Sequence, residues 1–100
     1  MMRLQNKSAV VTGAADGIGL AIAKAFAKEG ARVAMCDING EKCQLESTIL
    51  NQAGGDTIAI TCSVADTFQM QEMAGQVLAS FGKVDVLINN AAVAISRHVA

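Results

Sequence analysis

Hydrophobic and polar positions follow two different periods along this chain. Four short runs are rich in apolar or β-branched residues, as buried parallel strands are. These runs are Ser8–Thr12 (SAVVT), Arg32–Asp37 (RVAMCD), Thr57–Cys62 (TIAITC) and Val84–Asn89 (VDVLIN). Between them, apolar residues recur at helical spacing. The pattern therefore predicts four strands separated by three helices.

The first helix is expected over Gly17–Glu29, with Gly30 as a left-handed C-terminal cap. Its apolar face, at a period of 3.6 residues, is predicted to consist of Ile18, Ala21, Ile22, Ala25 and Phe26.

The second helix is expected to start at an Asn39 cap and to run to about Ala53, before Gly54 and Gly55. Its apolar face is weaker and consists of Cys43, Ile49, Leu50 and Ala53.

The third helix is predicted to follow Asp66 and Gln69, a pair that resembles a capping box. Gly82 should close it. Its apolar face is predicted to be Met70, Met73, Ala74, Val77, Leu78 and Phe81.

Strands that are separated by helices lie parallel, with right-handed crossovers. Helices then cover both faces of an open sheet. The fold class is therefore α/β: a doubly wound parallel sheet with four strands and three helices.

Composition narrows the range of functions. The chain has 100 residues, of which 52% are hydrophobic and 17% are charged, as expected for one folded domain and not for a disordered chain. The formal net charge of -1 gives no general attraction for nucleic acid or for an anionic membrane. With no Tyr, no Trp and three Phe, a stacking surface for single-stranded nucleic acid is not expected.

The three cysteines are Cys36, Cys43 and Cys62, and none belongs to a C-x-x-C pair. With His98 as the single histidine, we expect no metal site. The thiols should be reduced and mostly buried, as in a cytosolic protein. The N-terminal MMRLQNK is too short and polar for a signal peptide, and no apolar run approaches the roughly 20 residues of a membrane span. We expect a soluble, cytoplasmic protein.

The segment VVTGAADGIG, Val10–Gly19, joins the first strand to the first helix. Free N–H groups and the positive end of the helix dipole are available at such a position, and a phosphate can bind there. Gly13 would permit a sharp exit from the strand, Gly17 would remove a Cβ near a pyrophosphate, and Gly19 would allow close helix–strand packing. The alternative is a turn that only requires positive φ. Because a strand precedes and a helix follows, we predict a dinucleotide-binding turn.

Within this segment, TGAADGIG closely resembles the T-G-x-x-x-G-[IL]-G signature of the short-chain dehydrogenase/reductase family. Three further stretches are similar to motifs of that family in the same order, namely Gly30–Val33 (GARV), Cys62–Asp66 (CSVAD) and Val84–Ala91 (VDVLINNA). The resemblance implies a partial Rossmann-type fold. It also implies an NAD-dependent oxidoreductase that transfers hydride between the nicotinamide and an alcohol or carbonyl substrate.

Asp37 ends the second strand, near the distance of about 20 residues at which an acid binds the adenosine ribose of NAD. Its charge would repel the 2′-phosphate of NADP. Relatives that prefer the phosphate carry a basic residue where this chain has Ile38 or Asp16. We therefore expect NAD, with NADP less favoured. The alternative is that Asp37 only begins a turn.

The resemblance implies the following cofactor-binding residues: Gly13, Asp16, Gly17, Ile18, Gly19, Asp37, Ser63, Val64 and Asn90. Ser63 departs from the Asp or Asn that usually contacts the adenine amino group, and Ala92 replaces a glycine. Val64 would form an apolar wall for the ring, or simply pack in the core. Asn90 would border the cofactor ribose, tie down main chain at the end of the sheet, or do both.

The chemistry of the family depends on a tyrosine, a lysine four residues further on and a serine, all of which follow later strands. This chain contains no tyrosine, and His98 is not expected to replace it. We therefore assign no catalytic residue. Residues 1–100 are expected to be the N-terminal part of a single Rossmann domain, truncated before its catalytic half, that binds the cofactor and is inactive alone. A homo-oligomer of the full-length form is left open.

Two other readings stay open. One is a non-catalytic nucleotide-binding or interaction half-domain. The other is a methyltransferase-like domain that binds S-adenosylmethionine. The latter fits the order of strands and helices, but not the T-G-x-x-x-G-I-G string.

Overall fold

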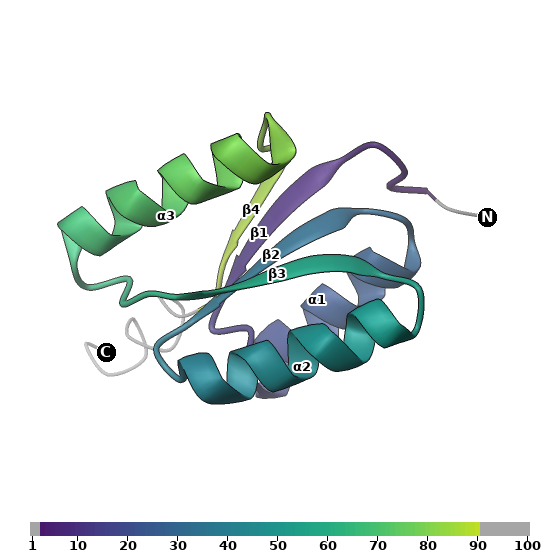
Figure 1. Cartoon of the computed structure of the whole chain (residues 1–100), viewed down its shortest axis with the longest axis horizontal. Coiled ribbons are helices and arrows are strands. Elements are labelled where there is room, and N and C mark those ends of the chain that lie inside the picture. Colours follow the sequence, from purple (N-terminus) through teal and green to yellow (C-terminus); the bar gives the residue numbers. More distant parts are fainter. Residues whose placement is uncertain (1–2, 91–100) are drawn as a thin grey trace, which may run out of the picture.

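A computed structural model describes residues 3–90 of the chain. It contains one parallel four-stranded sheet in the order β3-β2-β1-β4, with α1 and α2 on one face and α3 on the other (Figure 1). The elements are β1 (Ser8–Thr12), α1 (Gly17–Lys28), β2 (Arg32–Asp37), α2 (Gly40–Gln52), β3 (Asp56–Thr61), α3 (Thr67–Phe81) and β4 (Val86–Asn89). The α/β fold class, a partial Rossmann-type sheet with four strands and three helices, is confirmed.

The strands are all parallel, so their carboxyl ends lie at the same edge of the sheet. β1 lies in the centre, where Val10 pairs with Ala34 of β2 and with Leu87 of β4. β3 pairs with the outer side of β2. The carboxyl ends of the four strands therefore share the edge at which open α/β sheets bind ligands.

Successive residues of each strand contribute to two separate cores. Val11, Val33 and Met35 are buried on the side of α1 and α2, whereas Val10 and Ala34 are buried on the side of α3. This alternation follows from the period of two in a strand. Since helices cover both faces of the sheet, the strand sequences are nearly continuous apolar runs.

The predicted apolar face of α1 is wrong in part. The residues that α1 buries are Gly19, Ala23 and Ala27, whereas Ile18 is 71% exposed. Ala21 and Ala25 are also exposed. The helix turns its smallest residues toward the sheet because its first turn lies against the glycine loop, so the larger Ile22 and Phe26 pack at the margin of the core.

The apolar faces of α2 and α3 also differ from the pattern. Ile49, Ala53, Ala74 and Leu78 are exposed. In α2 the polar Ser47 is buried instead, because its hydroxyl lies 2.6 Å from Oγ1 of Thr57 and so has a partner. In α3 the buried residues are Met73, Val77 and Phe81.

Most of the predicted helix ends are confirmed. The Asn39 side chain accepts a hydrogen bond from the Lys42 N–H, and Asp66 accepts one from the Gln69 N–H. Gly30 and Gly82 have left-handed φ values of 94° and 80°. The capping box is only half formed, because the Gln69 side chain accepts from the Ser63 N–H and donates to the Asp66 carboxylate.

Two strands differ in extent from the expectation. β3 spans Asp56–Thr61 and not residues 57–62, and β4 begins at Val86 and not at Val84. Before β4, the Asp85 carboxylate accepts from the Ser8 N–H at 2.9 Å, while the Asp85 N–H donates to the Ser8 carbonyl at 2.8 Å. A side chain thus takes the place of a main-chain acceptor, and the regular ladder starts one residue later.

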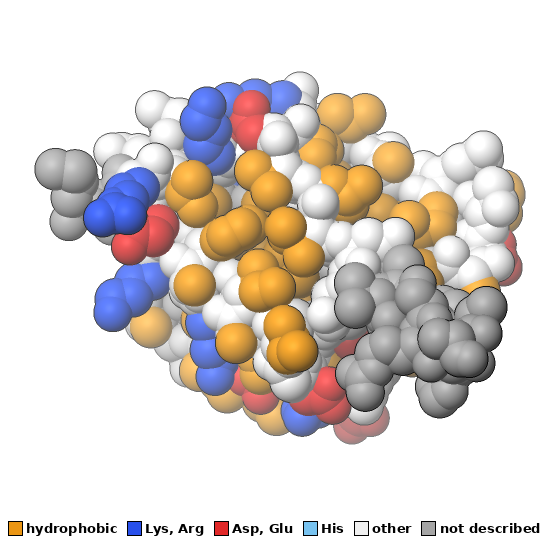
Figure 2. All heavy atoms as spheres, turned by 180° about the vertical axis from the view of Figure 1, so that it is seen from behind, with side chains coloured by type: hydrophobic (Ala, Val, Ile, Leu, Met, Phe, Trp, Pro, Cys, Tyr) orange, Lys and Arg blue, Asp and Glu red, His pale blue; other side chains and the backbone are white. Residues whose placement is uncertain are grey.

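β4 is an edge strand of the described sheet, and Leu87 on it is 57% exposed. Seen from the side opposite to Figure 1, hydrophobic side chains gather in the middle of the molecule (Figure 2).

Among the described residues, no helix is long and apolar enough to cross a membrane.

Candidate cofactor site

The loop between β1 and α1 depends on three glycines. Gly13 and Gly17 have φ values of 63° and 58°, in the left-handed region that favours glycine. A Cβ on Gly19 would overlap the carbonyl oxygen of Gly13. A Cβ on Gly17, in contrast, would meet nothing within 4 Å. The loop is therefore tight against the protein at Gly19 and open on its outer side at Gly17.

The N-terminus of α1 is left open by its own cap residue. The first N–H groups of a helix have no acceptor within the helix. Asp16 stands at the N-cap position, but its side chain makes no capping hydrogen bond. Its Oδ2 lies 3.9 Å from Nζ of Lys42 in α2 instead. N–H groups and the positive end of the helix dipole are thus available for an anion.

Asp37 joins the glycine loop to the end of β2. Its Oδ2 accepts a hydrogen bond from the Ala15 N–H at 3.0 Å, and its Oδ1 accepts one from the Asn39 N–H at 2.9 Å. The second bond forms the turn that the alternative reading of Asp37 expected. Each carboxylate oxygen has a further lone pair, so this turn does not prevent a ribose hydroxyl from binding.

A hollow of about 220 Å³ lies beside this carboxylate. It is lined by Gly13, Asp37, Ile38, Cys62, Ser63, Val64 and Ala65. The Ser63 hydroxyl oxygen accepts from the Ala65 N–H at 3.3 Å, which uses part of its capacity to accept from a ligand. The hollow brings together the residues predicted after β1, β2 and β3.

Asn90 lies at the other end of the glycine loop. Its Nδ2 would be 3.0 Å from a Cβ on Gly19. Nearby, the Thr12 hydroxyl at the end of β1 lies 3.1 Å from Oδ1 of Asn89. Of the nine predicted binding residues, Asp37 is the last residue of β2 and the others come after the carboxyl ends of β1, β3 and β4, whereas Ala92 and His98 lie outside the described residues.

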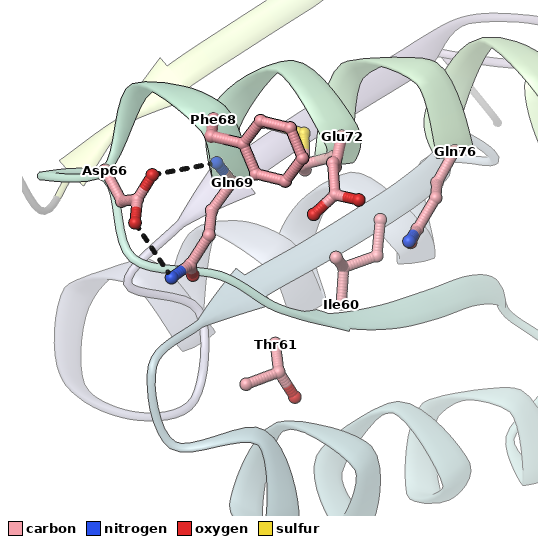
Figure 3. Close-up of a pocket in the computed structure, with 8 residues that line it drawn as sticks. Ile60, Thr61, Asp66, Phe68, Gln69, Glu72 and Gln76 are labelled. Atoms are coloured by element: carbon pink, nitrogen blue, oxygen red, sulfur yellow. Dashed lines mark hydrogen bonds between the residues drawn. The ribbon is translucent and has the colours of Figure 1, made fainter.

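A larger hollow of about 430 Å³ lies between the edge of β3 and α3 (Figure 3). Asp66 and Gln69 line it, and both are engaged in capping α3, as the dashed lines show. Ile60 and Phe68 contribute apolar surface there. This hollow contains none of the predicted cofactor residues.

The three thiols are buried near the site and are poor nucleophiles. Burial, together with the neighbouring Cys62, Cys43 and Asp37, raises the pKa of Cys36 to about 12. Burial and the Asp37 charge raise the pKa of Cys43 to about 11, despite an opposing hydrogen bond with the Ile60 backbone. Burial also raises the pKa of Cys62, which lines the smaller hollow. Within residues 3–90, no group of three or more His, Cys, Asp and Glu side chains could hold a metal ion.

Two residues near the site, Lys42 and Gly40, were not predicted from the sequence to belong to it. The ion pair between Lys42 and Asp16 depends on tertiary placement, because Lys42 lies in α2 whereas Asp16 is the cap residue before α1. A Cβ on Gly40 would overlap the Thr61 hydroxyl, so α2 begins in close contact with the end of β3. In the sequence, the one feature that marks Lys42 is its place three residues after Asn39, the predicted N-cap of this helix.

Comparisons with known proteins agree with this geometry. The family model of the short chain dehydrogenases matches residues 7–100. D-threitol dehydrogenase of Mycolicibacterium smegmatis is 47% identical over 95 residues, which cover 92% of this chain and 35% of that protein. Sorbitol dehydrogenase of Cereibacter sphaeroides is 41% identical over 91 residues, which cover 91% of this chain and 34% of that protein.

Among solved structures, a hydroxysteroid dehydrogenase from Escherichia coli superposes with a TM-score of 0.86 at 36% identity. The match covers 88% of this chain and 37% of that one. The chain therefore belongs to the short-chain dehydrogenase family. It spans about one third of the length of the two dehydrogenases named above.

Proposed function

We propose that this chain forms the NAD-binding part of an oxidoreductase that acts on an alcohol or carbonyl compound. The observation that carries the proposal is the open N-terminus of α1, where the Asp16 side chain leaves the N–H groups uncapped. When bound, the nicotinamide coenzyme supplies hydride transfer. The residues of this chain bind and orient it.

In this proposal, each part of the edge has its own role. The loop from Gly13 to Gly19 holds the diphosphate, since a phosphate can approach a backbone without Cβ atoms. Asp37 accepts hydrogen bonds from the adenosine ribose. Ser63 and Val64 border the adenine in the hollow that they line with Asp37.

The preference for NAD over NADP follows from charge. Asp37 and Asp16 both present carboxylates at this edge, and Ile38, the residue after Asp37, is apolar and exposed. A 2′-phosphate placed against Asp37 would meet a like charge, which disfavours binding. The hydrogen bonds that Asp37 accepts from two N–H groups hold its carboxylate in place.

The family and the names of the relatives support an alcohol or carbonyl substrate. D-threitol, sorbitol and hydroxysteroid dehydrogenases act on alcohols of different size, so the size of the substrate is not part of the proposal. We assign no catalytic residue, because the chain has no tyrosine. We propose that residues 1–100 are the N-terminal part of one Rossmann domain and catalyse no hydride transfer alone.

The proposal is tested by titrating the polypeptide, as expressed from its gene, with NADH, NADPH and S-adenosylmethionine in a calorimeter. We expect saturable NADH binding that is about tenfold tighter than NADPH binding, equivalent to about 1.4 kcal/mol. S-adenosylmethionine should not compete. Tighter binding of NADPH would overturn the preference for NAD, and binding of S-adenosylmethionine alone would overturn the proposed function.

A further inference from the structure

We propose that Lys42 could bind the 2′-phosphate of NADP, and that Asp16 prevents this by pairing with the Lys42 ammonium group. This inference rests on the proposed function, because it concerns the same dinucleotide site. It adds a residue of α2 that lies outside the glycine loop and does not line the adenosine hollow.

Lys42 and Asp16 close a ring of contacts around the ribose side of the site. The Ala15 N–H donates to Oδ2 of Asp37, whose Oδ1 accepts from the Asn39 N–H. The Asn39 side chain in turn accepts from the Lys42 N–H at 3.1 Å. The Lys42 ammonium then returns to Asp16, the residue after Ala15, at 3.9 Å. The ring thus connects the glycine loop with the start of α2.

The Lys42–Asp16 pair is poorly suited to a purely structural role. The side chains of Lys42 and Asp16 are 42% and 76% exposed. An ion pair so exposed to water contributes little to the stability of the fold. Asp16 also forgoes the capping bond that an aspartate at its position can make. The clearest physical consequence of the contact is electrostatic, since the Lys42 charge is matched by a carboxylate at the mouth of the site.

A basic residue near the acid after the second strand is what accommodates a 2′-phosphate in dinucleotide-binding folds. Lys42 is such a cation, held on the ring that contains Asp37. While Asp16 pairs with it, the Lys42 charge is compensated and a phosphate gains little from it. If the Asp16 charge is removed, the ammonium becomes free to attract the phosphate dianion.

The experiment measures dissociation constants of NADH and NADPH, by fluorescence or calorimetry, for four forms of the polypeptide as expressed from its gene. These are the natural protein, Asp16→Asn, Lys42→Gln and the double variant. We expect Asp16→Asn to tighten NADPH binding about tenfold relative to NADH binding. In the Lys42→Gln background, the same substitution should tighten NADPH binding by no more than about twofold.

Two controls accompany the cycle. Glu41→Gln removes one negative charge from an exposed position next to Lys42, and should leave the ratio of the two dissociation constants unchanged. Asp16→Ser also removes the charge and keeps a residue that suits an N-cap, so it should reproduce the effect of Asp16→Asn. Circular dichroism at matched temperature checks that every variant is folded.

The outcomes separate this inference from the proposed function. If both coenzymes bind but Asp16→Asn has the same effect with and without Lys42, the inference is wrong and the proposed function stands. If neither coenzyme binds to the natural protein, both are wrong. A gain for NADPH that requires Lys42 supports the inference.

Discussion

The carboxylate of Asp37 accepts a hydrogen bond from the backbone N–H of Ala15 at 3.0 Å, across 22 residues of sequence. This bond joins the end of β2 to the glycine loop. One residue earlier, the Ala14 N–H donates to the Cys36 carbonyl, so the connection continues the β1–β2 ladder into the loop. The acid proposed to bind the ribose therefore also fixes the loop proposed to bind the diphosphate.

Replacing Asp37 should therefore reduce both stability and coenzyme binding. We expect Asp37→Ala to lower the free energy of unfolding by about 2 kcal/mol, because two N–H groups lose their acceptor. The measurement is urea denaturation followed by circular dichroism. Asp56→Ala, which only breaks the exposed ion pair with Arg32, should cost less than about 1 kcal/mol. Equal losses for the two variants would contradict the role given to Asp37.

Gly19 and Gly75 offer a matched pair of helical glycines. Gly19→Ala places a Cβ against the Gly13 carbonyl, and we expect it to destabilise the protein by about 3 kcal/mol. Gly75→Ala in α3 meets nothing within 4 Å and should stabilise the protein by about 0.5–1 kcal/mol through helix propensity. Thermal unfolding of both variants provides the comparison. A neutral Gly19→Ala would show that the loop and α1 are not in close contact.

The sequence could predict those features of the fold that depend on residues close together in the chain. The strands and helices follow from periodicity, and the caps at Asn39 and Gly82 depend on residues a few positions away. The burial of Ala23 in place of Ala21 could not be predicted in this way. It depends on the contact of Gly19 with Gly13, which sets the rotation of α1 on the sheet.

Contacts between distant segments account for the remaining differences. The Asp85 carboxylate replaces a ladder acceptor for Ser8, so β4 begins later than its apolar run. The Lys42–Asp16 pair joins α2 to the cap residue of α1 through solvent-accessible side chains, which no periodic pattern marks. For the site, the family motifs predicted which residues lie at the edge, but not the ring that connects them.

The buried thiols should make stability fall in mild alkali. The folded-state pKa values of Cys36 and Cys43, about 12 and about 11, lie above the ordinary thiol value of 9.0. The folded protein therefore retains protons that the unfolded chain releases, and the stabilisation is present below about pH 9 and lost as the pH rises toward 11–12. Urea midpoints at three pH values between 7.5 and 10.5 measure the slope. Cys36→Val, which removes one titrating thiol, should flatten it; an unchanged slope would contradict this assignment.

At acid pH, protonation of Asp85 should lower the stability of the fold. The Ser8 N–H, assisted by Lys83, holds the pKa of this carboxylate below its ordinary value of 3.8. The unfolded chain therefore binds the proton first, so the stabilisation is present above about pH 4 and is lost as the pH falls below it. Asp85→Asn should reduce the loss of stability between pH 5 and pH 2.5. Lys83→Ala should retain most of that loss, because the Ser8 N–H is the larger cause; the reverse ranking would contradict it.

The account depends most on the open backbone at Gly17, and a comparison with Gly54 tests it directly. Both glycines have positive φ, 58° and 97°, and neither has an atom within 4 Å of an added Cβ. Gly17→Val and Gly54→Val should therefore lose similar stability through backbone strain. Calorimetric titration with NADH should show binding weakened at least about tenfold by Gly17→Val and unchanged by Gly54→Val. Unchanged NADH affinity in folded Gly17→Val would contradict a coenzyme diphosphate at this helix.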